Sequence, residues 1–250
     1  MMFIGLDLGW LASSSSGVCY LRRKAAGIEF VEWDVLETHQ AVLNWLDQVI
    51  ANETQVAIAI DAPLIIPNAS GMRLPDRLLH QHFGRYHAGC YPANQNLPFY
   101  PAMRDFTAAL AERGFAHATD SSADRRIMLE VYPHAATITL FNLSRILKYK
   151  KGRVAERRQG LGQLFALQQR YFAQLQPQLT LNLTIDTDQK GAALKALEDK
   201  LDALTCAYLA AYWVWHGQPQ NQVYGDRASG YIIVPDPSPQ ESARTCGIQK

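Results

Sequence analysis

Acidic residues occur at four points in the sequence where the neighbouring residues are apolar. Asp7 lies in FIGLDL, and Asp61 directly follows VAIAI. Glu130 lies in IMLEV, and Asp202 is the only charged residue in LDALTCAYLAAYWVW. A carboxylate that is buried without a partner is strongly destabilising or becomes neutral. Each acid therefore needs an arginine of its own, or the acids share a bound cation.

The segments that carry Asp7 and Asp61 are expected to bring the two carboxylates together. Both segments are typical of buried strands. If they pair in parallel, both acids lie near the carboxyl edge of the sheet, where ligands bind in open α/β sheets. Alternation places Asp7 on the same face as two glycines, and Asp61 on the same face as Ala57 and Ala59. The side chains that accompany the two acids on that face are small, so another element can approach it closely.

A long final helix, expected over residues 189 to 215, is the candidate for this approach. Asp199 and Asp202 are three residues apart and therefore share one face of the helix. Two carboxylates about 4 Å apart repel by about 4 kcal/mol at an effective dielectric constant of about 20. Three or four converging acids would need a cation, and oxygen ligands favour Mg²⁺ or Mn²⁺ over zinc.

The order of the expected elements indicates an α/β fold with a mixed sheet flanked by helices. Short connections predict an antiparallel three-strand meander from residues 3 to 8, 17 to 23 and 28 to 35. A helix over residues 38 to 50, capped by Thr38, then leads to the strand before Asp61, which we expect to be parallel to a neighbour. The remaining expected elements are a strand in RRIMLEVY, a helix over residues 160 to 175, the final helix and a strand at YIIVP.

Residues 63 to 105 differ from the rest of the chain, since they carry six prolines and the tract CYPANQNLPFYPAM. We expect an irregular insertion at about residues 63 to 120, with one helix near residues 75 to 86. Long segments of this kind are usually lids or binding loops. The chain is otherwise predicted to be one domain over residues 1 to 235, followed by a disordered tail at 236 to 250.

A basic tract, RILKYKKGRVAERR at residues 145 to 158, holds seven Lys or Arg residues and one acid. Phosphate contacts come mainly from these two residue types, so the tract is a candidate for nucleic-acid binding. The alternative is a solvated loop before a helix. The candidate phosphate contacts are Lys148, Lys150, Lys151 and Arg153, together with Arg73 and Arg77 in the insertion. For Arg77, the alternative is a surface ion pair with Asp76.

The composition excludes several classes of protein. A chain of 250 residues with 48% apolar and 19% charged residues is typical of a globular protein. Its net charge of +1 excludes a strongly basic nucleic-acid coat protein. The longest apolar stretch, residues 203 to 215, is shorter than a membrane span of about 20 residues, and we expect no signal peptide. The four cysteines are widely spaced, as is typical of free thiols, so we expect a cytoplasmic protein with no membrane partner.

Five segments occur in the order typical of one family: GLDLGW, AIDAPL, LEVYPHAA, a Y-K-K-G tract and EDKLDALTCAYLAA. Together they resemble the RNase H-like family known as domain of unknown function 429, whose members are described as predicted nucleases. The resemblance covers about residues 3 to 235. It implies an RNase H-like mixed sheet flanked by helices.

The wider resemblance is to RuvC-like nucleases, which carry acids on the first strand, after the fourth strand and in a D-x-x-D pair on the last helix. By this likeness the metal ligands are Asp7, Asp61, Asp199 and Asp202. Glu130 matches an acid on the fifth strand of the family, and the implied catalytic residues are Asp7, Asp61, Glu130 and Asp202. RuvC-like enzymes commonly have Glu where this chain has Asp61. The implied reaction is hydrolysis of phosphodiester bonds in DNA or RNA with two Mg²⁺ or Mn²⁺ ions.

Two other functions use the same fold. The first is a sugar-kinase or actin-like ATP-binding phosphotransferase, which begins with a similar D-x-G strand. Such proteins normally need two copies of the domain and a glycine-rich adenosine motif, and this chain has one copy and no such motif. The second is a catalytically silent nucleic-acid-binding module, which would keep the basic tract and lose acids. Stabilisation by magnesium would favour the enzyme, and stabilisation by ATP would favour the phosphotransferase.

Overall fold

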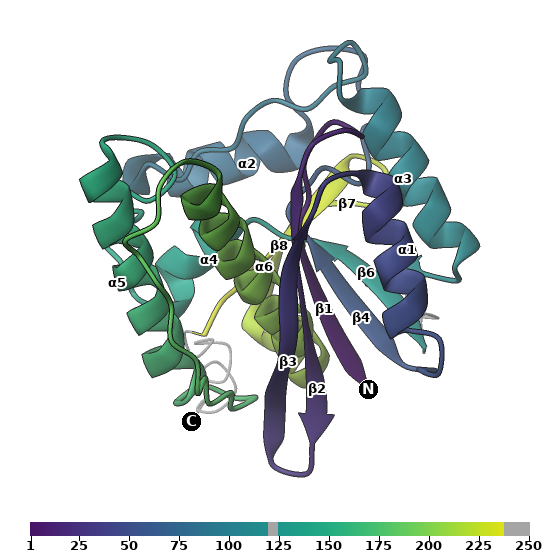
Figure 1. Ribbon diagram of the computed structural model, residues 1–250. Coiled ribbons are helices and arrows are strands. Elements are labelled where there is room, and N and C mark those ends of the chain that lie inside the picture. The colour runs from purple at the N-terminus through teal and green to yellow at the C-terminus, as the bar shows by residue number, and fades with distance from the viewer. Residues whose placement is uncertain (120–124, 238–250) are drawn as a thin grey trace, which may run out of the picture.

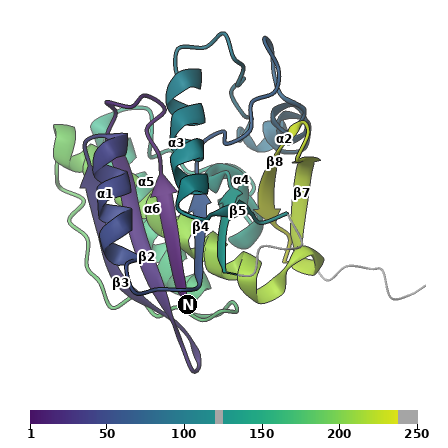
Figure 2. The ribbon, with the colours of Figure 1, turned by 90° about the vertical axis from the view of Figure 1, so that its right-hand side faces the viewer.

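A six-stranded mixed sheet forms the centre of the computed structural model, which describes residues 1–119 and 125–237. Its antiparallel part consists of β1 (Met2–Asp7), β2 (Ser16–Lys24) and β3 (Gly27–Leu36). Its parallel part adds β4 (Val56–Ile60), β5 (Ala116–His117) and β6 (Arg126–Glu130). The order across the sheet is β3-β2-β1-β4-β6-β5, with β6 labelled in Figure 1 and β5 in Figure 2. The predicted meander followed by parallel strands is therefore confirmed.

The connection from β3 to β4 runs through α1 (His39–Val49), as the sequence predicts. Thr38 caps this helix, because its side-chain oxygen accepts a hydrogen bond from Ala41 N. β4 then pairs in parallel with β1, with Leu6 opposite Ile60. The carboxyl ends of these two strands therefore lie at the same edge of the sheet.

Different helices cover the two faces of the sheet (Figure 1, Figure 2). Bulky side chains such as Ile4 and Ile58 pack on one face, against α1 and α3 (Tyr100–Glu112). The other face carries smaller side chains such as Ala57 and Ala59. It is covered directly by α6 (Gly191–His216), against which α4 (Pro133–Leu140) and α5 (Val154–Phe172) pack in turn.

Glycines on this second face allow α6 to lie directly on the sheet. A Cβ atom at Gly5 would lie 2.0 Å from Ala203 O and 2.1 Å from Ala207 N. A Cβ atom at Gly17 would lie 2.1 Å from Asp199 O. Only glycine leaves room for such an approach of two backbones. The small face predicted for β1 is therefore the face that α6 contacts.

The segment between β4 and β6 contains more regular structure than the sequence predicts. The helix expected near residues 75 to 86 is present as α2 (Leu74–Phe83) and the 3₁₀ turn η1 (Gly84–Tyr86). The expectation of an otherwise irregular insertion is wrong for α3. Pro101 lies in the first turn of α3, where proline is tolerated because its missing N–H has no helical partner.

A hairpin of β7 (Asn221–Asp226) and β8 (Gly230–Pro235) follows α6. β8 matches the strand predicted at YIIVP, whereas the sequence does not predict β7. Ile232 and Val234 of β8 pack with side chains of α2 and α4. Residues 238 to 250, which make up most of the tail predicted to be disordered, lie outside the described residues. Within the described ranges, no helix has both the length and the apolar composition needed to cross a bilayer.

Candidate metal and active site

Asp7 and Asp61 are neighbours at the carboxyl edge of the sheet. Asp7 is the last residue of β1, and Asp61 directly follows β4. Asp61 N donates a hydrogen bond to Leu6 O at 2.9 Å, which continues the parallel ladder past the end of β4. Because Leu6 and Ile60 face α1 and α3, alternation sends both carboxylates to the α6 face.

Asp199 and Asp202 of α6 complete the acidic group. Both are buried, with 3% of Asp199 and none of Asp202 exposed. The contact between Gly17 and the backbone of Asp199 fixes the height of this helical turn above the sheet. The three-residue spacing keeps both acids on one side of the helix. The structure thus brings together the four predicted metal ligands, Asp7, Asp61, Asp199 and Asp202.

Two residues of the basic tract hold the carboxylate of Asp202. Tyr149 OH donates a hydrogen bond to Asp202 Oδ1 at 2.8 Å, and Lys150 Nζ forms an ion pair with Oδ2 at 2.8 Å. Burial raises the pKa of the Tyr149 hydroxyl well above its usual value, so the group stays a neutral donor. Arg157 Nε donates to Tyr149 O at 3.2 Å and so ties the tract to α5.

The pKa values of Asp7 and Asp61 show how crowded the negative charge is. Burial raises the pKa of Asp7 well above its usual value, and the charges of Asp202 and the other aspartates raise it further. Burial likewise raises the pKa of Asp61 to about 7, and Asp202 adds to this shift. Lys150 opposes both shifts. Burial lowers the pKa of Lys150 itself, but the nearby carboxylates more than offset this and hold it well above its usual value.

A pocket of about 390 Å³ opens at this edge of the sheet. Three of the aspartates line it together with Lys150 and Lys195, and the aromatic side chains of Trp10, Tyr91 and Tyr132 line the rest. Its volume is at the lower end of the range of about 300–1,000 Å³ that is typical of small-ligand sites. The pocket therefore combines a strongly charged part with an aromatic part.

His134 adds a neutral polar group to the wall of this pocket. Burial lowers the pKa of His134 to about 4, and the positive charge of Lys150 contributes, so the ring is uncharged at neutral pH. Its Nε2 atom has no hydrogen-bond partner within residues 1–119 and 125–237. This buried nitrogen is therefore an unused hydrogen-bonding group beside the pocket.

The donor atoms of the site suit Mg²⁺ or Mn²⁺, which prefer carboxylate oxygens. Lys195 Nζ lies 2.7 Å from Asp199 Oδ1, as Lys150 lies against Asp202. When all four carboxylates are ionised, the two ammonium groups leave an excess of two negative charges, which one divalent ion would balance. In the described part of the chain, no three His, Cys, Asp or Glu side chains are grouped as a ready-made metal site. The ammonium groups of Lys150 and Lys195 occupy Asp202 and Asp199. A metal ion would therefore bind to these carboxylates as an ammonium group moves away.

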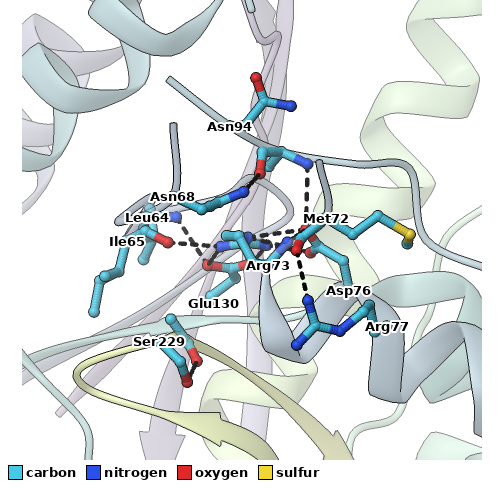
Figure 3. Close-up of polar contacts among 12 residues, drawn as sticks. Leu64, Ile65, Asn68, Met72, Arg73, Asp76, Arg77, Asn94, Glu130 and Ser229 are labelled. Atoms are coloured by element: carbon cyan, nitrogen blue, oxygen red, sulfur yellow. Dashed lines mark hydrogen bonds and ion pairs between the residues drawn. The ribbon is translucent and has the colours of Figure 1, made fainter. Parts of the chain in front are cut away.

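Glu130 lies near Asp61, because β6 is next to β4, and its charge adds to the raised pKa of Asp61, but its side chain is not part of the acidic group. Glu130 pairs with Ile60 in the parallel register, so its side chain leaves the sheet on the face opposite to Asp61. There Arg73 binds both carboxylate oxygens, with Nη2 2.6 Å from Oε1 and Nη1 3.0 Å from Oε2 (Figure 3). Leu64 N donates a further hydrogen bond to Oε2 at 2.8 Å. These surroundings give no support to the catalytic role predicted for Glu130.

Arg73 was predicted to contact phosphate, but only 3% of the residue is exposed. Its Nη2 atom also lies 2.7 Å from Asp76 Oδ1, so one guanidinium joins two buried carboxylates (Figure 3). A guanidinium in this position cannot reach a nucleic-acid backbone. Its role is structural instead, because it ties the start of α2 to the end of β6.

The other predicted phosphate contacts lie at the surface. Lys148, Lys151, Arg153 and Arg77 are exposed, and Lys150 is partly exposed in the pocket. Arg77 donates to a backbone carbonyl oxygen of the insertion at 3.2 Å, and the alternative pairing with Asp76 is not formed, because Arg73 takes that acid. Their exposure is compatible with phosphate contacts, which remain predictions.

Two groups in the site, Lys195 and Tyr149, are not among the site residues that the sequence predicts. Lys195 precedes Asp199 by four residues, and this spacing is a signal for a helical ion pair that the sequence does contain. The hydrogen bond from Tyr149 to Asp202 joins segments that are far apart in the chain, and no local pattern indicates it.

Comparisons with known proteins identify a family. No curated protein matches the sequence. A family model described as "Protein of unknown function (DUF429)" matches residues 5–228, a range that includes all four converging aspartates and the basic tract. Because this match extends over most of the sequence, the chain belongs to the DUF429 family of proteins of unknown function.

Proposed function

We propose that the protein is a metal-dependent nuclease that hydrolyses phosphodiester bonds in nucleic acid. The observation behind this proposal is the convergence of four aspartates at one sheet edge, which in their ionised form carry more negative charge than Lys150 and Lys195 balance. Mg²⁺ or Mn²⁺ is the expected cofactor. Displacement of both ammonium groups would leave the charge of all four carboxylates available, which is enough to balance two ions.

Each residue of the site has a distinct role in this proposal. Asp7, Asp61, Asp199 and Asp202 would hold the ions, which when bound would supply a hydroxide nucleophile and stabilise the leaving oxygen. Lys150, released from Asp202 Oδ2, can pair with a phosphate of the substrate. Tyr149 keeps Asp202 oriented, because its hydrogen bond goes to the other carboxylate oxygen, Oδ1. Glu130 is not included, since Arg73 already engages both of its oxygens.

The topology supports a relationship to RNase H-like proteins and, within them, to RuvC-like nucleases. An antiparallel meander precedes parallel strands, with one acid ending β1 and one following β4. A D-x-x-D pair lies on the last helix, α6. These places correspond to the acids of RuvC-like enzymes, and we therefore propose that this family shares their fold and their chemistry.

The test is cleavage of labelled single-stranded and double-stranded DNA and RNA by the purified protein. We expect cleavage with Mn²⁺ or Mg²⁺ and none with EDTA. Asp7→Asn and Asp202→Asn should each lower the rate by orders of magnitude, because each change removes an anionic ligand and keeps the side-chain shape.

A matched control separates this activity from a contaminating nuclease. Asp105→Asn makes the same change at an acid of α3 whose side chain is 66% exposed, and it should cleave as the wild type does. Unchanged cleavage by Asp7→Asn and Asp202→Asn would overturn the mechanism. Metal-independent binding of nucleic acid without cleavage would indicate a silent binding module instead.

A further inference from the structure

Tyr91 is a large aromatic residue that does not pack into any of the apolar cores of the protein. It is 64% exposed, more than any other large apolar side chain of the described residues, and belongs to none of the apolar clusters. It lies between η1 and α3, yet its side chain lines the same pocket as Asp7 and Asp61. The insertion thus places an exposed aromatic ring beside the acidic site.

Lys151 is positioned at the edge of this ring. Lys151 Nζ donates a hydrogen bond to Tyr91 OH at 2.8 Å and lies 5.4 Å from the ring centroid. These two distances place the ammonium group of Lys151 on the far side of the Tyr91 hydroxyl from the ring centre. The two faces of the Tyr91 ring are therefore not covered by Lys151. Lys151 follows Lys150, whose ammonium group reaches the acids, and the tract therefore connects the ring with the charged part of the pocket.

Trp10 forms another aromatic part of the wall. It follows β1 and is held by Phe99, with ring centroids 4.6 Å apart in an edge-to-face arrangement. Single-strand-binding proteins combine these two features, since bases stack on aromatic rings while lysine or arginine contacts the backbone. An aromatic wall next to a lysine and a candidate phosphate site is suited to a nucleotide, with its base on the ring.

The depth and size of the pocket decide between single and double strands. Asp202 is fully buried and Asp199 is 3% exposed, so a phosphate must enter the pocket to approach them. A volume of about 390 Å³ is at the lower end of the range of about 300–1,000 Å³ for small-ligand sites, which suits one nucleotide and not a duplex. A duplex keeps its bases stacked inside a rigid rod, whereas a single strand can turn a nucleotide into such a pocket.

We infer that the site takes single-stranded nucleic acid, with a base stacked on Tyr91 and an adjoining phosphate bound by Lys151. This inference rests on the proposed function for the reaction that follows binding. What it adds is that the substrate is single-stranded, and binding measurements can test this without any cleavage.

The experiment measures fluorescence anisotropy with a labelled oligothymidylate about twelve nucleotides long and with a hairpin duplex of similar length. Ca²⁺ replaces Mg²⁺, the salt concentration is fixed, and a gel checks that the strands stay intact. Wild-type protein should bind the single strand at least about tenfold more tightly than the duplex. Tyr91→Ala should weaken single-strand binding by about tenfold or more and leave duplex binding unchanged.

Two further variants keep the inference open to refutation. Tyr91→Phe keeps the ring and loses the hydrogen bond to Lys151, so it should bind the single strand nearly as the wild type does. A loss as large as that of Tyr91→Ala would mean that the ring only positions Lys151, and stacking would be excluded. Trp215→Ala is the matched control, since this aromatic residue is 39% exposed at the far end of α6 from the acids.

The two proposals fail in different ways. Equal binding of single strand and duplex, no binding of either, or normal binding by Tyr91→Ala would overturn the inference about the substrate. Hydrolysis of a small chromogenic phosphodiester by the wild type with Mn²⁺ reports the chemistry separately. Absence of that hydrolysis together with Tyr91-dependent binding would contradict the nuclease and leave the single-strand site standing.

Discussion

Lys150 Nζ lies 2.8 Å from Asp202 Oδ2, and this ion pair joins the basic tract to α6 inside the acidic site. The charge of Lys150 also opposes the rise in pKa that burial causes at Asp7 and Asp61. Lys150 is therefore a counter-charge for the whole group. A divalent ion would bind to the same acids, so the ion and the ammonium group compete.

Lys150→Met should destabilise the protein in EDTA, because it leaves buried carboxylates without their counter-charge. We expect a loss of about 2 kcal/mol, discounted for the partial exposure of the lysine, which lowers the melting temperature by about 4–8 °C. Mn²⁺ should narrow the difference from the wild type, since the ion replaces the missing charge. Thermal unfolding with EDTA and with Mn²⁺ measures both effects. Lys148→Met, at an exposed neighbour, is the control, and equal melting of the two variants in EDTA would contradict the prediction.

Stability without metal should fall as the pH rises from about 4 to 7. The pKa of Asp61 is raised from its usual 3.8 to about 7, so in this range the folded protein binds more protons at Asp61 than the unfolded chain does. The raised pKa of Asp7 acts in the same direction. Melting temperatures in EDTA should therefore decrease over this range, and Asp61→Asn should flatten the decrease and melt above the wild type at pH 8. A wild-type protein that becomes more stable over the same range, or a variant with the same slope, would refute this.

The convergence of the aspartates could be predicted because it depends on local rules. Alternation along a strand fixes which residues share a face, so the small residues beside Asp7 and Asp61 mark the face that α6 contacts. Helical spacing likewise fixes Asp199 and Asp202 on one side of α6. Once β1 and β4 are known to be neighbours, their parallel pairing brings Asp7 and Asp61 to the same edge of the sheet.

The position of Glu130 could not be predicted in this way, because it depends on the register between β4 and β6. Glu130 is opposite Ile60, and a shift of one residue would have placed it on the face of Asp61. The sequence contains no turn that fixes this register, since a long insertion separates the two strands. α3 was missed for a different reason: the prolines of the insertion favour loops, and only the position of Pro101 in a first turn makes it compatible with a helix.

Arg73→Met should be strongly destabilising, because it leaves Glu130 and Asp76 buried without their shared cation. Loss of one partner of a buried ion pair typically costs about 3–5 kcal/mol. The double variant Arg73→Met, Glu130→Gln should recover part of this loss, since one of the stranded charges is removed. Arg77→Met, four residues further along α2 and exposed, should change the stability by less than about 0.5 kcal/mol. Chemical denaturation measures all three, and a small effect of Arg73→Met alone would mean that this ion pair does not hold α2 on the sheet.

Gly5→Ala should push α6 away from β1 and so displace the acidic residues that α6 carries. The added methyl group would lie 2.0 Å from Ala203 O, a backbone atom that cannot rotate away, and the helix would have to shift. Such overpacking typically costs about 1–3 kcal/mol and sometimes more, and it would move Asp202, one residue before the contact. We therefore expect lower stability in EDTA together with a smaller increase of melting temperature on addition of Mn²⁺.

Gly162→Ala is the matched control, because the nearest atom to its Cβ would be Thr187 Cγ2 at 3.8 Å. Alanine in the middle of α5 should stabilise the protein by about 0.5–1 kcal/mol. If Gly5→Ala melted as the wild type does and kept its full response to Mn²⁺, close contact between α6 and β1 would not be what positions Asp202.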